Sequence, residues 1–247
     1  MCRKHRIERG SKLALVTGAS TGIGRQYTEQ LAEIGYNLII VSRTESTLQE
    51  VAHEIEDKHS IKVIIKPMDL AVEGAAEELF NWCKSEGHVV DVLINNAGMF
   101  SFCDMINTPV ERVKRTITLH DITYTVLCQL FGYDMAERGG GYILNMSSFS
   151  VAFAKEVREK NVWVTAVCPA GIATDLYGLT KKWQGIGLKL HALSTPAFCA
   201  RRGLNSLWRK RKCIVPDWWC KAFIPICGAL PRFALNWLRN FTMKWQK

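Results

Sequence analysis

The sequence lacks the features that define several classes of protein. It has no apolar run of about 18 residues, the length that a membrane-spanning helix needs. Residues 1–11 contain no apolar segment of the kind found in secretory signals. The nine cysteines are an odd, scattered set without a CxxC pair or a Cys/His cluster. We therefore expect a cytoplasmic protein with reduced thiols and no metal site.

Acidic residues are scarce in one region only. Residues 181–247 contain 14 Lys and Arg but a single acidic residue, whereas residues 1–180 contain 18 Lys and Arg and 22 acidic residues. Six of the eight tryptophans also lie in residues 181–247. The formal net charge of +9 therefore reflects a special C-terminal region. It does not indicate a general nucleic-acid surface, and we expect no nucleic-acid partner.

The hydrophobic pattern is typical of a folded α/β protein. The chain has 247 residues, 48% of them hydrophobic, which is enough for one buried core. Short runs of Val, Ile and Leu predict strands at residues 13–17, 37–42, 62–68, 89–95, 142–146 and 162–167. Helical spacing predicts helices at residues 27–34, 48–58, 73–85, 181–190 and 197–208. This alternation predicts a single Rossmann-like, doubly wound parallel sheet with helices on both faces.

A glycine-rich turn follows the first predicted strand. The sequence Thr17-Gly-Ala-Ser-Thr-Gly-Ile-Gly24 runs from that strand directly into a helix. Glycines there allow a tight turn and bring bare backbone against a ligand, and the backbone amides of a helix N-terminus favour an anion. A dinucleotide pyrophosphate fits this context, and a purely structural turn is the alternative.

The residue after the second predicted strand indicates which dinucleotide is bound. A site for NAD usually places an acidic residue there to bind the ribose hydroxyls, whereas a site for NADP uses a basic residue for the 2′-phosphate. The sequence has Arg43 at this position. NADP(H) is therefore favoured over NAD(H), and a solvated loop arginine is the alternative reading.

Three motifs carry a family resemblance. They are the turn just described, Asn95-Asn-Ala-Gly98 after the fourth predicted strand, and Asn145-Met-Ser-Ser148 after the fifth. In this order and spacing they resemble the short-chain dehydrogenase/reductase family over about residues 10–180. The resemblance implies a dinucleotide-binding core in residues 1–180, with residues 181–247 as a lid and a basic, aromatic-rich helical C-terminal extension of the same domain.

The resemblance also implies roles for particular residues. Those implied to cradle the pyrophosphate are Gly18, Ser20, Gly22, Ile23 and Gly24. Asp69 would contact the adenine, and Asn95 and Ala97 would line the adenosine ribose side. Thr174, at the end of a PGxxxT-like stretch, would lie near the nicotinamide, and Ser148 would polarise the substrate carbonyl as the catalytic serine.

One family feature is missing from its usual place. The family places a tyrosine about a dozen residues after the serine and a lysine one helical turn later. Residues 149–161 contain no tyrosine, so the segment that carries this pair is absent there. Thr118 occupies the place of a helix asparagine that supports the family's lysine. Tyr177 and Lys181 have the right spacing but follow the PGxxxT-like stretch, where a lid residue is the more typical role.

The same deletion shortens the connection between the last two predicted strands. Only residues 149–160 separate Ser148 from the end of the crossover, close to the minimum for parallel strands. Phe149, Phe153 and Val157 still recur at helical spacing. In the family this helix helps to form the dimer, so the deletion is expected to weaken any homo-oligomer.

The C-terminal residues 231–247 have a basic amphipathic pattern with aromatic residues. Such a helix could rest on an anionic membrane surface, cover a hydrophobic substrate channel, pack on a partner subunit, or close the pocket of its own domain. A peripheral membrane contact is therefore one of four readings.

These features give one function and two alternatives. The chain resembles an NADP(H)-dependent carbonyl reductase or alcohol dehydrogenase for a small hydrophobic substrate, acyl or steroid-like, impaired by loss of the Tyr/Lys pair. The alternatives are a catalytically inactive NADP(H)-binding protein and a truncated, non-functional variant.

Overall fold

The protein is built around one parallel sheet. A computed structural model describes residues 7–99, 108–146, 158–169, 171–174, 180–189, 191 and 193–217. Its seven strands lie in the order β3-β2-β1-β4-β5-β6-β7, and each neighbouring pair is parallel. The strands are β1 Leu13–Thr17, β2 Asn37–Ser42, β3 Val63–Pro67, β4 Val92–Asn95, β5 Gly141–Asn145, β6 Val162–Val167 and β7 Cys213–Ile214. The predicted fold class is confirmed, and β7 is the one described strand that the sequence pattern did not indicate.

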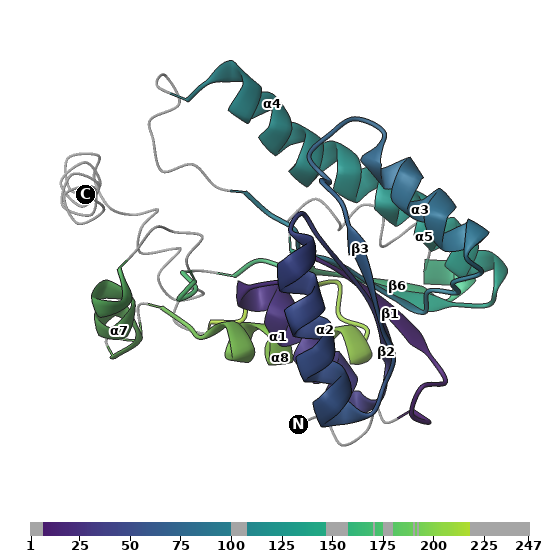
Figure 1. Cartoon of the computed structure of the whole chain (residues 1–247), viewed down its shortest axis with the longest axis horizontal. Helices are drawn as coiled ribbons and strands as arrows, with labels where there is room; N and C mark the ends of the chain where they lie inside the picture. The colour runs from purple at the N-terminus through teal and green to yellow at the C-terminus, as the bar shows by residue number, and fades with distance from the viewer. Residues whose placement is uncertain are drawn as a thin grey trace.

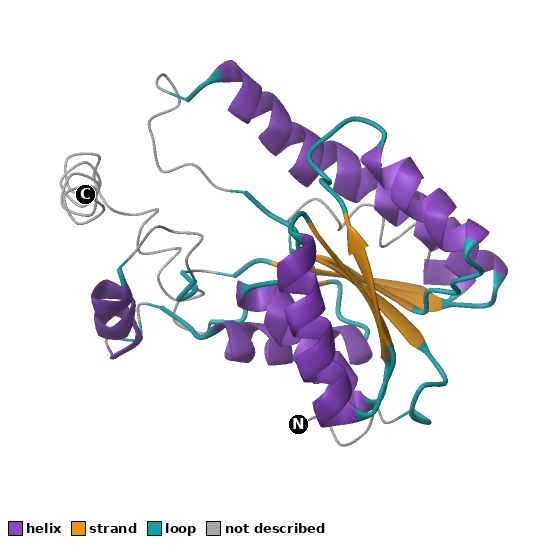
Figure 2. Cartoon of the chain, in the orientation of Figure 1, coloured by secondary structure: helices purple, strands orange, loops and turns teal. Residues whose placement is uncertain are grey.

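Helices cover both faces of the sheet (Figures 1 and 2). Helices α1 (Gly22–Ile34), α2 (Glu45–His59) and α8 (Pro196–Trp208) lie on one face. Helices α3 (Ala75–Ser85) and α5 (Tyr124–Glu137) lie on the other, with α4 (Val110–Ile117) extending beyond them. Helix α7 (Lys181–Lys189) stands apart from both layers. No helix in the described ranges is long and apolar enough to cross a membrane.

The strands form because their side chains are apolar on both sides. The central residues of β2, Leu38 to Val41, are completely buried. Leu38 and Ile40 join the core on the α1 side, whereas Ile39 and Val41 join the core on the α3 and α5 side. Because side chains alternate along a strand, an unbroken apolar run can supply two cores at once.

The shortened crossover does not prevent β5 and β6 from pairing. They are in register along their whole length, from Gly141 opposite Val162 to Asn145 opposite Ala166. The two strands therefore pair in parallel although only residues 149–160 separate Ser148 from Asn161, which is near the minimum for a parallel crossover.

Helix α8 and strand β7 contribute to the core. Strand β7 extends the sheet at β6, and α8 packs against α1. The ring of Trp208, at the end of α8, stacks on the ring of Tyr36 with 6.1 Å between the ring centroids. It meets the ring of Tyr142 edge-to-face, with 5.0 Å between the centroids. Residues 196–217 thus pack in the same domain as β1 and α1. Residues 218–247 lie outside the described residues.

An ion cluster ties α3 to α5, and its removal should lower stability. Asp134 accepts hydrogen bonds from Lys84 at 2.8 Å and Arg138 at 2.9 Å, and its side chain is only 13% exposed. Burial by itself raises the pKa of Asp134, but the bonds from Lys84 and Arg138 outweigh it and leave the pKa below its usual value. We expect Asp134→Asn to lower the free energy of unfolding by about 1 kcal/mol at pH 7.

The pH dependence checks the cause of this effect. A lowered carboxyl pKa stabilises the fold above the unfolded pKa of about 4, and this contribution is lost as the pH falls below it. Urea unfolding should therefore show a difference between Asp134→Asn and the wild type that shrinks on acidification. The exposed Glu137→Gln on the same helix should change little, and an equal effect of both substitutions would refute a specific role for the cluster.

Candidate functional site

The candidate site lies at the carboxyl ends of β1 and β4, from which the chain continues on opposite faces of the sheet. Strand β1 has β2 on one side and β4 on the other. The connection after β1 leads to α1 on one face, whereas the chain between β4 and β5 runs through α4 and α5 on the other face. In an open parallel sheet, this divergence leaves a crevice at the carboxyl ends of the two strands, and ligands bind there.

Glycines let the loop after β1 lie directly against the loop after β4. Gly18 has a φ of +65°, and a Cβ at this residue would lie 2.8 Å from Cα of Ala97. A Cβ at Gly24 would overlap the carbonyl oxygen of Gly18 and the side-chain amide of Asn96. Gly22 also has a positive φ, +57°. A side chain at Gly18 or Gly24 would clash with neighbouring atoms, and a side chain at Gly18 or Gly22 would strain the backbone.

Two polar side chains hold this glycine loop in place. Thr17 Oγ1 accepts hydrogen bonds from the backbone amides of Asn96, at 2.9 Å, and Ala97, at 3.0 Å. The side-chain amide of Asn96 donates to the carbonyl oxygens of Thr17, at 3.1 Å, and Gly18, at 3.3 Å. The sequence assigned no role to Thr17 or Asn96, although both lie inside the motifs and border the predicted residues.

The N-terminus of α1 is open to an anion. Thr21, the residue before the helix, makes no side-chain capping bond, and the first turn of α1 contains no acidic residue. In contrast, the first turns of α2 and α3 contain glutamates. The first amides of an α-helix have no partner within the helix, so those of α1 can bind a negatively charged group. Ser20 lies in the preceding turn, and Ile23 packs against the core.

Arg43 and Asp69 lie near each other at the ends of neighbouring strands. Arg43 is exposed just after β2. Asp69 follows β3, accepts a hydrogen bond from the amide of Ala71 at 3.0 Å, and pairs with Arg115 at 2.6 Å. Burial by itself raises the pKa of Asp69, but Arg115, Ala71 and Arg43 together hold it below its usual value. No local pattern in the sequence pointed to Arg115, which comes from α4.

Asn95 is the last residue of β4. Its side chain is completely buried, and its amide donates to Oδ1 of Asn145 at 2.8 Å. Asn145 in turn donates to the sulfur of Cys128 at 3.1 Å. Burial raises the pKa of Cys128 to about 11, so this thiol is neutral. The side-chain amide of Asn95 therefore joins β4 to β5, whereas its Oδ1 has no hydrogen-bond partner among the described residues.

Ala97 and Thr174 border the crevice itself. Ala97 is half-buried, and its carbonyl accepts a hydrogen bond from Tyr124 at 2.7 Å. A Cβ at Gly22 would lie 3.4 Å from Cγ2 of Thr174, so Thr174 lies against the glycine loop. The buried hydroxyl of Thr174 has no hydrogen-bond partner among the described residues, and the same is true of Ser42 at the end of β2. A buried hydroxyl without a partner is costly, and a bound ligand can satisfy it.

Part of the predicted site lies outside the described residues. This applies to Ser148, to Tyr177 and to the amphipathic segment 231–247. Lys181 begins α7 and is exposed. Thr118 begins a π-helical turn, Thr118–Thr123, in which Nε2 of His120 lies 3.2 Å from the backbone nitrogen of Met99.

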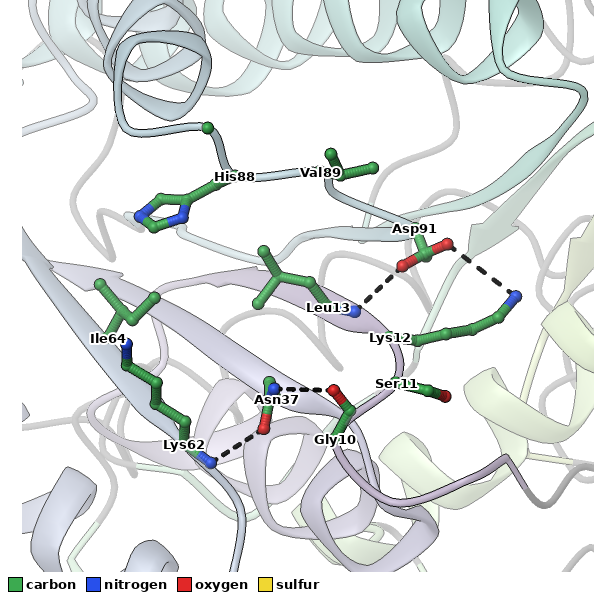
Figure 3. A pocket seen from close by; sticks show the side chains of 11 residues that line it. Gly10, Ser11, Lys12, Leu13, Asn37, Lys62, Ile64, His88, Val89 and Asp91 are labelled. Carbon is green, nitrogen blue, oxygen red and sulfur yellow. Dashed lines mark hydrogen bonds and ion pairs between the residues drawn. The ribbon is translucent and has the colours of Figure 1, made fainter.

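A separate cavity of about 360 Å³ lies at the amino ends of the strands, and Figure 3 shows the residues that line it. It is lined by residues at the amino ends of the first strands, including Lys12, Asn37 and Lys62. Asp91 beside it accepts a hydrogen bond from the amide of Leu13 at 3.0 Å. This cavity shares no lining residue with the glycine crevice.

The crevice therefore has the parts of a dinucleotide site. The glycine loop lets a ligand lie directly against the protein backbone, and the open end of α1 suits a pyrophosphate. The buried hydroxyls of Thr174 and Ser42 have no partner within the part of the chain that the structure describes. These features fit a dinucleotide that lies across the carboxyl ends of β2, β1 and β4.

Comparisons with known proteins agree with this geometry. A family model described as short chain dehydrogenase matches residues 12–152. Human very-long-chain 3-oxoacyl-CoA reductase is 29% identical over 197 residues, which cover 68% of this chain and 62% of that protein. The chain thus spans less than two thirds of the length of this relative.

Solved structures have the same fold. A short-chain dehydrogenase from Sphingobium yanoikuyae in complex with NADPH superimposes with a TM-score of 0.72 at 23% identity, covering 90% of this chain and 97% of that one. A 7β-hydroxysteroid dehydrogenase superimposes with a TM-score of 0.78 at 22% identity, covering 90% of this chain and 93% of that one.

Proposed function

The chain belongs to the short-chain dehydrogenase family, and from this premise we propose that it is an NADP(H)-dependent oxidoreductase for a hydrophobic carbonyl or alcohol. The observation that carries the proposal is the contact of Gly18 with Ala97, which brings bare backbone to the open end of α1. The bound cofactor supplies the hydride donor or acceptor. The residues of this chain bind and orient the cofactor and the substrate.

Each residue of the crevice has a part in binding the dinucleotide. Gly18, Ser20, Gly22, Ile23 and Gly24 surround the pyrophosphate, whose charge meets the first amides of α1. The exposed guanidinium of Arg43 binds the 2′-phosphate, because a planar, permanently charged group suits phosphate oxygens. Asp69 contacts the adenine through the carboxylate lone pairs that Ala71 and Arg115 leave free. Ala97 borders the ribose, and the hydroxyl of Thr174 binds the nicotinamide end.

The proposed substrate is hydrophobic, with an acyl-like carbonyl as the first candidate. The human relative is named for a very-long-chain 3-oxoacyl thioester, and one structural relative for a hydroxysteroid. Residues 181–247 combine six tryptophans with 14 basic residues, which suits an apolar chain with an anionic end. We also propose a cytoplasmic protein with a peripheral membrane contact through residues 231–247, because the basic and aromatic residues of this segment suit an anionic lipid surface.

Turnover is proposed to be slow. Ser148 polarises the carbonyl, but residues 149–161 contain no tyrosine to deliver the proton to the substrate oxygen. The second candidate function, an NADP(H)-binding protein without turnover, is favoured by the same observation. The two functions differ in one observable, because only the first includes ketone-dependent oxidation of NADPH by the wild type.

Replacing Arg43 tests the choice of cofactor. We expect Arg43→Ala to weaken NADPH binding by about 10- to 100-fold, since it removes charge-assisted bonds to the 2′-phosphate. NADH has no such phosphate, so its affinity should change less than about threefold. Fluorescence titration of both variants with both nucleotides measures this. The control is Lys62→Ala, which replaces an exposed lysine at the amino end of β3. An equal loss of NADPH and NADH affinity in Arg43→Ala would contradict the assignment of Arg43 to the 2′-phosphate.

A further inference from the structure

Two cysteines meet at the β7 edge of the sheet. Cys213 on β7 lies opposite Ala166 on β6, and the amide of Cys168 donates to the carbonyl of Ile214 at 2.9 Å. Side chains alternate along a strand, so Ala166 and Cys168 point to the same face, and residues opposite each other in register share a face. Cys168 and Cys213 are therefore diagonal neighbours on one face of the sheet.

The two thiols also interact directly. Burial raises the pKa of Cys168 to about 11, and the neighbouring Cys213 thiol acts on this pKa in the same direction. Diagonal neighbours on adjacent strands lie near the upper limit of the separations that disulfides bridge, so a small shift of the short edge strand β7 would let the two sulfurs join. The strands need no change of register for the sulfurs to join.

Access distinguishes this pair from the other described cysteines. Cys213 is exposed and Cys168 is half-buried, whereas Cys83, Cys128 and Cys199 are buried. The four exposed basic residues 209–212 immediately precede Cys213. They attract an anionic oxidant such as oxidised glutathione to this edge of the sheet.

We propose that Cys168 and Cys213 are a site of reversible oxidative modification, at which a disulfide joins β6 to β7. The Cys213 thiolate attacks one sulfur of oxidised glutathione, breaks its S–S bond and releases one glutathione thiolate. Cys168 gives its proton to solvent and attacks the Cys213 sulfur, which releases the second glutathione. The two protein thiols lose two electrons, and one oxidised glutathione becomes two reduced ones.

The disulfide would close a loop that contains part of the candidate site. Residues 168–213 include Thr174 and all of α7 and α8. Cross-linking this loop restricts the unfolded chain and fixes the short edge strand β7. We therefore expect the melting temperature of the oxidised protein to rise by about 5 °C, and dithiothreitol to reverse the rise. The inference does not depend on nucleotide binding.

Peptide mapping of the full chain tests the proposal. The protein is incubated with oxidised glutathione, the remaining thiols are alkylated, and the digest is analysed without reduction. A peptide pair that links Cys168 to Cys213 is expected in the wild type and in the control Cys83→Ser. Cys213→Ser should give no link and leave Cys168 alkylated, whereas Cys168→Ser should accumulate glutathione on Cys213.

Two results would overturn the proposal of a Cys168–Cys213 disulfide. One is a wild-type protein in which Cys213 carries glutathione while Cys168 stays free, since the second attack would then not occur. The other is a link from Cys213 to a different cysteine, which would mean that the pair on adjacent strands is not the preferred one. Formation of the Cys168–Cys213 link in the wild type, and its loss in Cys213→Ser, supports the proposal.

Discussion

A helical segment carrying Tyr-x-x-x-Lys, inserted between Ser148 and Phe149, is expected to raise the rate of ketone reduction with NADPH by about 10²- to 10⁴-fold. A positioned general acid typically contributes this factor, because the substrate oxygen becomes negatively charged as hydride arrives. Lysine one turn after tyrosine favours the ionised phenol and so brings its pKa closer to neutrality. The insertion point lies after β5 and so leaves the glycine loop unchanged.

The matched control is an insert of the same length with Phe in place of Tyr and Met in place of Lys. It restores the length of the crossover without the proton donor, so any gain that both inserts share is structural. The rate is measured as NADPH oxidation at saturating nucleotide over a panel of hydrophobic ketones. A native chain as fast as the Tyr/Lys insert would contradict the proposal that catalysis is impaired. Tyr177 and Lys181 would then be the first residues to replace.

Gly24→Ala is expected to abolish nucleotide binding and to lower the free energy of unfolding by about 3 kcal/mol. The added methyl would overlap the carbonyl oxygen of Gly18 and the side-chain amide of Asn96. Neither neighbour can move freely, because Asn96 holds the loop through bonds to Thr17 and Gly18. The clash should therefore displace the whole glycine loop from the end of β4.

Gly185→Ala on α7 is the control for this substitution. A Cβ at Gly185 would meet no atom within 4 Å, so the change should be neutral or slightly stabilising. Both variants are compared by urea unfolding and by NADPH titration. Normal NADPH affinity in a folded Gly24→Ala protein would show that the glycine loop is not the binding site.

The strands and most helices could be predicted because local pattern and burial agree. In β2, four consecutive apolar residues are buried on alternating sides, and the loop after it is polar. The pattern failed for α5, whose buried residues recur at helical spacing, because apolar residues such as Leu130 and Tyr133 also lie outside the buried face and blur the stripe. It also failed for β7, because two residues beside a basic run have no periodicity and pair only once β6 is in place.

The glycine positions of the site were also predictable, since a strand, a turn and a helix in succession leave little choice of backbone. The partners that hold the turn were not. Arg115 reaches Asp69 from a helix 46 positions later in the chain, and Asn96 meets Gly18 from the loop after β4. The contact of Asn95 with the ribose side stays a prediction, whereas its complete burial and its bond to Asn145 arise from the packing of β4 on β5. Such contacts exist only after the strands have assembled.

The most direct test is a titration of the purified chain with NADPH and NADH, followed by tryptophan fluorescence, with thermal unfolding of the same samples. We predict a cooperative melt, saturable NADPH binding at least about tenfold tighter than NADH binding, and a stabilisation of about 2.7 kcal/mol at 100 times the dissociation constant. Absence of binding to either nucleotide, with a broad melt or none, would contradict the claim that the glycine crevice is a dinucleotide site.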